Sequence, residues 1–316
     1  VLAIYLATDF TQTLEDVKTG LSNGMIYALI ALGYTMVYGI IQLINFAHGE
    51  VVMLGAMVAF SVIGALAGTS LPPLIIVLAG ILAAVPACML VGYAMERVAY
   101  RPLRGAPRLA PLITAIGISI ILQHVAMLVW SRSPLAFPQI IPLVRFHIGG
   151  AIITGVQIAI ILTSLLMMAA LTLLVYRTKL GIAMRATSQN PQIAGLMGID
   201  IDRIISFTFI VGAALAAVAG VMVGTYYGIA HYSMGALLGM KAFSAAVLGG
   251  IGNLAGAMLG GILLGVVEAL GAGYIGDLTN NVFGSNYQDV FAFLVLIAVL
   301  VFRPSGLLGE RVGDRA

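Results

Sequence analysis

The chain has 316 residues, of which 61% are hydrophobic and 9% are charged, and its mean hydropathy is +1.10. In soluble proteins roughly a quarter of the residues are charged, so this composition excludes a soluble globular protein and indicates a polytopic membrane protein. The net charge of +3 does not point to nucleic acid, because the charged residues gather between the apolar runs.

Apolar runs long enough to cross about 30 Å of hydrocarbon follow one another along the chain. They lie near residues 21–41, 46–67, 73–95, 111–130, 151–176, 204–228, 242–271 with a break inside, and 290–302. Such runs must be helices in lipid, and the alternation of a barrel strand is absent. We expect an all-α fold, a single transmembrane domain over 1–316 with about eight to ten transmembrane helices. The single cysteine, Cys88, excludes an internal disulfide and is expected to serve packing.

The first two runs are joined by INFAHGE, a segment too short for a real loop. It contains Asn45, His48 and Glu50, and polar groups at membrane depth are costly and usually face protein or water. One interpretation is a tight polar turn whose side chains satisfy backbone groups. The other is a polar gate or an ion relay. We favour the turn.

Basic residues concentrate in three regions, about 97–110, 177–203 and 303–316. The positive-inside rule makes these two loops and the C-terminal tail cytoplasmic. Counting the spans then places the N-terminus outside, and the first ten residues, too short for a signal peptide, are interpreted as a trimmed start. Glu96 and Arg97 are expected to form an ion pair at a helix end beside the first basic loop.

The stretch 181–203 is a long polar break that carries its own helix signal. Asn190 is a good N-cap, Pro191 suits the first helical position, and Gly198 can end the helix in the left-handed conformation. Residues three and four apart form an apolar flank, namely Ile193, Leu196 and Met197. A short helix of this kind either docks on a partner protein or lies on lipid headgroups, and its shape alone does not decide between them.

A second break lies in VLGGIGNLAGAMLGGILLG, where Gly249, Gly250 and Gly252 make a poor helix interior. We expect a broken glycine-rich helix that bends near 249–253. The glycines that follow at intervals of four offer smooth faces for close helix packing, which is the interpretation we favour. The alternative is that unwound backbone up to Asn253 lines a cavity and contacts substrate.

Lys241 and Glu268 are ionisable residues within or at the edge of apolar runs. Glu268 is interpreted as a buried acid paired with Lys241, as a protonated core acid, or as part of a relay, and the sequence does not choose between these roles.

The lysines, Lys18, Lys179 and Lys241, all lack the Walker pattern of a phosphate-binding loop. A nucleophile elbow and a metal-binding His-Glu-x-x-His helix are also absent. We therefore expect no enzymatic activity and no metal site in this chain. A membrane pore with a docking helix and no nucleotide-binding site of its own indicates that a separate ATPase supplies the energy.

Several ordered blocks run through the chain: ALIALGYTMVYGIIQLINFAHGE, ERVAYRPLRG, LITAIGISIILQ, MGID with DRIISFTF, GMKAFSAAVLGGIGNLAGAMLGGILLGVVEAL and RPSGLLG. Together they resemble the LivH-type inner-membrane permease of bacterial branched-chain amino acid ABC importers. Related permeases for urea and short amides share parts of this pattern. ERVAYRPLRG and NFAHGE favour the branched-chain amino acid branch.

The resemblance implies a multi-pass inner-membrane subunit that carries leucine, isoleucine or valine. Its implied partners are a second homologous permease, two cytoplasmic ATPase subunits, a periplasmic substrate-binding protein and membrane lipid, but no nucleic acid. ATP and Mg would be bound in the ATPases, which leaves this chain without a cofactor.

By position in the family, the helix at 190–198 is the counterpart of the importer coupling helix. The residues expected to couple to the ATPase are Arg185, Asn190, Pro191, Gln192, Ile193, Ala194, Gly195, Leu196 and Gly198. The candidates for the translocation pathway are Asn45, His48, Glu50, Gly249, Gly250, Gly252, Asn253 and Glu268.

Two alternatives stay open beside this function. One is a permease for urea or short-chain amides. The other is an ion-coupled secondary transporter or a passive channel that uses His48, Glu50 and Glu268 and needs no partner subunit. A structural scaffold ranks last, because the chain has many helix breaks and polar groups within the membrane.

Overall fold

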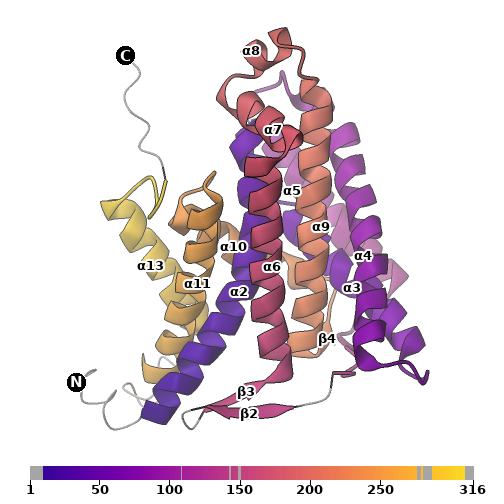
Figure 1. Ribbon diagram of the computed structural model, residues 1–316, viewed down its shortest axis with the longest axis vertical. Helices are drawn as coiled ribbons and strands as arrows, with labels where there is room; N and C mark the ends of the chain where they lie inside the picture. Colours follow the sequence, from indigo (N-terminus) through magenta and orange to yellow (C-terminus); the bar gives the residue numbers. More distant parts are fainter. Residues whose placement is uncertain are drawn as a thin grey trace.

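A computed structural model of the chain describes residues 10–107, 109–141, 144–148, 151–275, 279 and 287–309 (Figure 1). The first half contains α2 (Phe10–Ile41), α3 (His48–Leu66), α4 (Pro73–Met95), a π turn η1 (Glu96–Tyr100), a 3-10 turn η2 (Arg101–Leu103), α5 (Leu109–Val129) and strands β1 (Leu135–Ala136), β2 (Arg145–Ile148) and β3 (Ala151–Thr154). The second half contains α6 (Gly155–Arg177), α7 (Lys179–Gln189), α8 (Pro191–Leu196), α9 (Ile201–Tyr227), β4 (Ile229–Ala230), α10 (Met234–Gly249), α11 (Leu254–Leu270), a π turn η3 (Gly271–Ile275) and α13 (Gln288–Phe302).

The all-α membrane fold is confirmed. Among the described residues, seven helices are long and apolar enough to cross a membrane, namely α2, α3, α4, α5, α6, α9 and α11. Two shorter apolar helices, α10 and α13, add to them within the described ranges, which agrees with the eight to ten expected. The chain is therefore a polytopic helical membrane protein.

The start of the first helix and the region before α6 differ from the expectation. α2 begins at Phe10 rather than near residue 21, and residues 151–154 form a strand rather than helix. The polar residues in the added turns explain both differences. Glu15 accepts a hydrogen bond from the backbone N–H of Ile152 at 2.6 Å, and Lys18 donates to the Ile152 carbonyl at 2.5 Å. These bonds attach the β2–β3 hairpin to α2 at one end of the molecule.

The centre of the fold is the contact between α2 and α11, where glycines on both helices let the two backbones touch. A Cβ placed on Gly261 would lie 2.5 Å from the Cα of Ala28, and one placed on Gly24 would lie 2.8 Å from the Cα of Ile262. Small residues are what permit such close approach in membranes. Around this pair, α2 also packs against α6, α7, α9 and α10.

The described parts of the three basic regions lie at one end of the bundle. Arg101 and Arg104 of the first loop form ion pairs with Asp202 at the start of α9. The segment after α13 packs on the α10–α11 turn, where Gly306 approaches Gly250. We assign this as the cytoplasmic end by the positive-inside rule. Figure 1 places α8 at this end and the β2–β3 hairpin at the opposite, outer end.

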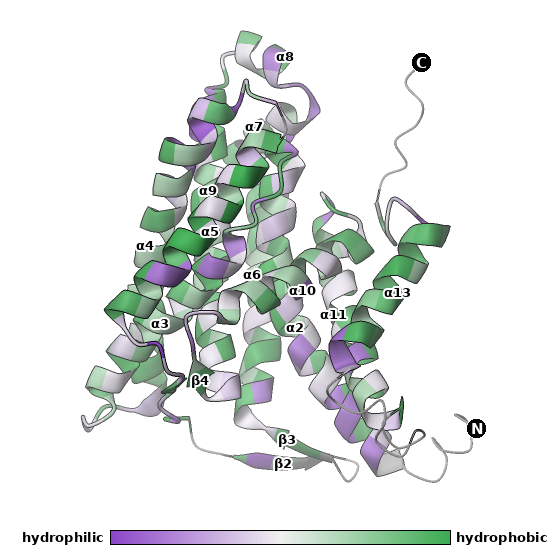
Figure 2. Cartoon of the chain, turned by 180° about the vertical axis from the view of Figure 1, so that it is seen from behind, coloured by the Kyte–Doolittle hydropathy of each residue, from purple (hydrophilic) through white to green (hydrophobic). Residues whose placement is uncertain are grey.

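Apolar side chains cover the flanks of the molecule between these two ends. Figure 2 shows hydrophobic colour along the long helices and hydrophilic colour near α7 and α8 and at the outer end. On α4, α5 and α6 large side chains such as Leu82, Leu128 and Leu166 are exposed. This distribution is the one a lipid-embedded bundle needs.

Most of the N-terminal stretch that was interpreted as a trimmed start lies outside the described residues. Residues 1–9, Arg108 and residues 310–316 lie outside them. The first turns of α2 lie at the outer end (Figure 1).

The α2–α11 contact yields a first prediction. Gly261→Ala should lower the free energy of unfolding by about 1–3 kcal/mol, because the added methyl group meets the α2 backbone. Gly117→Ala on α5 is the matched control, since a Cβ there meets nothing within 4 Å. Denaturant unfolding of the detergent-solubilised chain measures both. Equal stability of the two variants would contradict the close contact.

Candidate functional site

The cytoplasmic end carries the helix pair α7 and α8, which we call the coupling element because α8 lies within the stretch 190–198 for which coupling was predicted. The Asn190 side chain accepts from the N–H of Ile193 at 3.0 Å, Pro191 is the first helical residue, and Gly198 has a φ of +86°. The capping signals are therefore correct, but α8 is only six residues long and ends at Leu196. A separate helix, α7 (Lys179–Gln189), forms the preceding part of the polar break, for which no helix was predicted.

The surface of α8 is apolar and uncovered within the described part of the chain. Leu196 and Met197 are 87% and 79% exposed, whereas Ala194 is 4% exposed and packs inward. In Figure 1 α8 forms the tip of the molecule. Exposed apolar side chains that are this far from the transmembrane helices indicate an interaction surface.

Arg185 faces the chain's own helices instead of the partner side. Its guanidinium donates to the Val175 carbonyl at 2.5 Å and lies over the Tyr176 ring at 5.2 Å. Gly181 lies against the α6 backbone at Leu174 and Val175. These contacts hold α7 firmly against the end of α6.

The segment between α2 and α3 is a polar turn, as favoured from the sequence. Asn45 accepts hydrogen bonds through Oδ1 from the N–H of Ala47 at 3.1 Å and from the Tyr100 hydroxyl at 2.9 Å. Tyr100 was missed in the sequence, because it lies among basic residues of an expected loop. Its signal is an aromatic residue within ERVAYRPLRG, and its buried ring packs on Phe209 at 5.0 Å.

His48 and Glu50 begin α3 and are both buried. The His48 ring contacts Tyr34 at 4.7 Å between centroids and fills the space beside Gly33, where a Cβ would collide with it. Glu50 accepts hydrogen bonds from Ser119 at 3.1 Å and from Gln123 at 2.7 Å. Glu50 thus joins α3 to α5, a helix whose surface is mostly exposed.

The expected break near 249–253 is confirmed, and it takes the form of a hairpin turn between two antiparallel helices, α10 and α11. Asn253 caps α11 by accepting from the N–H of Gly256 at 3.0 Å. Gly250 and Gly252 have φ values of +104° and +100°, which only glycine adopts readily. The turn lies at the cytoplasmic end, where it packs against Gly306 of the segment after α13 and lies close to α7.

The segment after α13 closes this turn and was not anticipated. Leu307 and Leu308 donate their N–H groups to the carbonyls of Leu248 and Gly249, both at 2.9 Å. Asn253 donates its side-chain amide to the Leu308 carbonyl at 2.9 Å. The last carbonyls of α10, normally unpaired at a helix end, are thereby satisfied by the chain itself. We call residues 303–309 the closing segment.

Lys241 and Glu268 form an ion pair at 2.6 Å, which is one of the three roles considered for Glu268. Both side chains are almost fully buried. Lys241 also pairs with Asp289 of α13 at 2.6 Å and lies 5.6 Å from the centroid of the Tyr27 ring. This charged cluster joins α2, α10, α11 and α13, and the contribution of Asp289 was not foreseen.

The ion pair expected between Glu96 and Arg97 beside the first basic loop is not formed. Glu96 is paired with Arg104 rather than with Arg97, and it accepts from the Ser206 hydroxyl at 2.5 Å. Neighbouring residues on a helix point in different directions, so Glu96 and Arg97 do not face each other. The η1 and η2 turns bring Arg104 back to Glu96.

A small cavity of about 80 Å³ connects the coupling element with the hairpin turn. α2 lines it with Thr35 and Gly39, α7 with Met184 and Arg185, and the turn with Gly252. Within the described ranges the buried Thr35 hydroxyl has no hydrogen-bond partner. The candidates for the translocation pathway therefore fall into three groups: the α2–α3 turn, this cavity with the hairpin turn, and the charged cluster.

Comparison with known proteins bears on this arrangement. The family model described as branched-chain amino acid transport system / permease component matches residues 17–300. The chain belongs to this family. It is 49% identical to the high-affinity branched-chain amino acid transport system permease protein BraD of Pseudomonas aeruginosa, over 94% of this chain and 96% of that protein.

More distant relatives also align along nearly their whole length. The LivH permease protein of Escherichia coli K12 is 43% identical over 96% of this chain and 98% of its own length. A probable LivH permease protein of Methanocaldococcus jannaschii is 28% identical over 92% of each chain. No solved structure gives a significant match. As a permease of this family with seven long apolar helices, the chain is a multi-pass protein of the inner membrane.

The charged cluster yields a second prediction. Lys241→Met should lower the free energy of unfolding by roughly 3–5 kcal/mol, because it leaves Glu268 buried beside a second carboxylate. The double variant Lys241→Met with Glu268→Leu should recover most of this loss, since Asp289 is one-third exposed and can be hydrated. Denaturant unfolding in detergent compares the two. A double variant as unstable as the single one would argue against a tightly coupled ion pair.

Proposed function

We propose that this chain is a permease subunit of an ATP-driven importer for leucine, isoleucine and valine. The observation that carries the proposal is the exposed apolar tip of α8 at the cytoplasmic end, on a chain that belongs to a branched-chain amino acid permease family. A permease without a phosphate-binding loop needs an external source of energy, and this tip offers a place to receive it.

The partner at α8 is, in this proposal, one of two cytoplasmic ATPase subunits, which bind ATP and Mg. Movement of α8 has two routes into the membrane. α7 is attached to α6 through Arg185, and α8 leads into α9, whose start is capped by Asp200 at 3.1 Å from the N–H of Arg203. Closure of the ATPases would therefore tilt α6 and α9, both of which cross the membrane.

The expected coupling residues divide into two roles under this proposal. Leu196, with Ile193 and Gln192 beside it, is exposed and would contact the ATPase. Ala194 is buried, and Asn190, Pro191 and Gly198 shape the helix. Substitution at Ala194 would therefore disturb the element itself, so Leu196 is the better position for testing contact.

The substrate path is proposed to form between this chain and a second homologous permease, supplied by a periplasmic binding protein. Branched-chain amino acids are zwitterions with apolar side chains, which suits walls that are mostly apolar with a few polar groups. The small cavity beside Thr35 and Gly39 adjoins the coupling element, so we propose it as the beginning of the inward opening.

A permease for urea or short-chain amides remains the alternative within the ABC class. An ion-coupled carrier has less support, because Lys241 holds Glu268 and two side chains of α5 hold Glu50. These partners give both carboxylates structural roles.

Reconstitution in liposomes tests the function directly. The chain, with and without its partner permease, ATPases and binding protein, is assayed for uptake of labelled leucine and labelled urea under ATP. We expect leucine uptake only in the complete set. Uptake by the lone chain would establish a channel or secondary carrier, and preference for urea would establish the other ABC branch.

A single substitution tests the docking site. Leu196→Glu should weaken ATPase association and ATP-dependent uptake at least tenfold, a loss of about 1.4 kcal/mol or more in binding free energy. Ser70→Glu, which adds the same charge at an exposed position of the outer end, should leave both unchanged. Association is measured by co-purification of the ATPases. Normal association in Leu196→Glu would remove the docking claim.

A further inference from the structure

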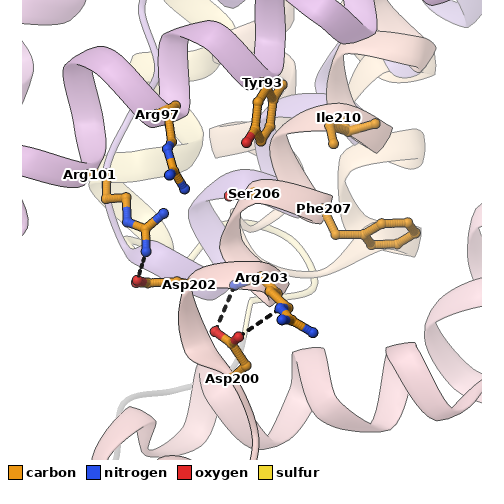
Figure 3. Close-up of a pocket in the computed structure, with 9 residues that line it drawn as sticks. All are labelled: Tyr93, Arg97, Arg101, Asp200, Asp202, Arg203, Ser206, Phe207 and Ile210. Atoms are coloured by element: carbon orange, nitrogen blue, oxygen red, sulfur yellow. Dashed lines mark hydrogen bonds and ion pairs between the residues drawn. The ribbon is translucent and has the colours of Figure 1, made fainter.

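A larger cleft, separate from the groups described above, opens between α4 and α9 at the cytoplasmic end. Its volume is about 560 Å³. Figure 3 shows arginine and aspartate side chains gathered at one part of it and aromatic and aliphatic side chains at another. The function proposed above does not use this cleft.

The arginines around the cleft outnumber the carboxylates that pair with them by one. Asp202 is bound by Arg101 and Arg104, and Asp200 pairs with Arg203 at 2.9 Å. Because Arg104 also neutralises Glu96, four arginines face three carboxylates when Arg97 is included. Within the described ranges Arg97 has no ion pair, and its guanidinium extends into the cleft (Figure 3). An anion that enters the cleft therefore meets an available guanidinium.

The other wall of the cleft is apolar and belongs to the lipid-facing surface. Tyr93, Phe207 and Ile210 line it. The nearby side chains of Leu90 on α4 and Val98 on η1 are 69% and 76% exposed, which suits a surface that faces acyl chains. Arg97 lies two residues after the end of α4, at the end of the molecule assigned as cytoplasmic. A free phosphate ion would use only the arginine, whereas a phospholipid would use both walls.

We propose that this cleft binds an anionic phospholipid of the cytoplasmic leaflet. Arg97 contacts the lipid phosphate, and an acyl chain lies along Tyr93, Phe207 and Ile210. Basic pockets between transmembrane helices on the cytoplasmic side recognise headgroups in this way. The bound lipid would rest against Asp200 and Arg203, where α8 passes into α9, and would steady the base of the coupling element. This site does not depend on which substrate the permease carries.

Native mass spectrometry of the detergent-solubilised full chain tests the site. We expect phosphatidylglycerol to bind at least tenfold more tightly than phosphatidylcholine. Arg97→Gln should weaken phosphatidylglycerol binding about fivefold, which corresponds to about 1 kcal/mol for one basic residue near an anionic lipid. Arg177→Gln, which removes the same charge from an exposed position at the cytoplasmic end outside the cleft, is the matched control and should have no effect.

Four outcomes would overturn the proposal. Equal binding of the two lipids, or equal loss in Arg97→Gln and Arg177→Gln, would exclude a specific site. Competition by inorganic phosphate at the same molar concentration as the lipid would assign the cleft to a free anion. Loss of ATPase co-purification in Arg97→Gln with unchanged lipid binding would assign it to a partner protein.

Photo-crosslinking of the unmodified chain keeps the test independent of any variant. Phosphatidylglycerol with a diazirine on its acyl chain should label the α4 peptide that contains Tyr93 and the α9 peptide that contains Phe207 and Ile210. Labelling should fall when unlabelled phosphatidylglycerol is added in excess but not when phosphatidylcholine is added. Labelling spread evenly over α4, α5 and α6 would overturn the proposal.

Discussion

The backbone contact between α2 and α11 is the constraint on which the rest of the structure depends. Helices in lipid gain nothing from burying apolar surface against one another, so close van der Waals packing must hold them together. Gly24 and Gly261 allow that packing, and α2 then supports α6, α7, α9 and α10. The polar interactions, including the Lys241–Glu268 pair, fix how the surrounding helices sit on this pair.

At the cytoplasmic end one short helix, α8, is connected to two long helices, α6 and α9. α8 contributes an exposed apolar tip, while Arg185 fastens α7 to α6 and Asp200 begins α9. Polar groups in this region are mostly used to connect elements of the chain, whereas the apolar residues are left uncovered. Under the function proposed above, that division would separate the parts that transmit a movement from the part that receives it.

Local signals in the sequence predicted the elements that they define, whereas most contacts between distant segments were missed. Asn190, Pro191 and Gly198 defined α8 because caps act over a few residues, and composition alone fixed the membrane class. The pairing of Glu96 with Arg104 and the role of Tyr100 depend on the η1 and η2 turns, which no periodicity reveals. The hairpin at Gly250 looked like a break in one helix, because its partner is a segment more than fifty residues away.

The closing segment has a consequence for how the protein is made. The α10–α11 hairpin is synthesised and inserted before residues 303–309 leave the ribosome, so the carbonyls of Leu248 and Gly249 lack their partners during that interval. Domains generally fold as their chain emerges, from the N-terminus onward. This hairpin therefore reaches its final hydrogen bonding only after residues 303–309 have been translated, and a product truncated before them would carry an open hairpin.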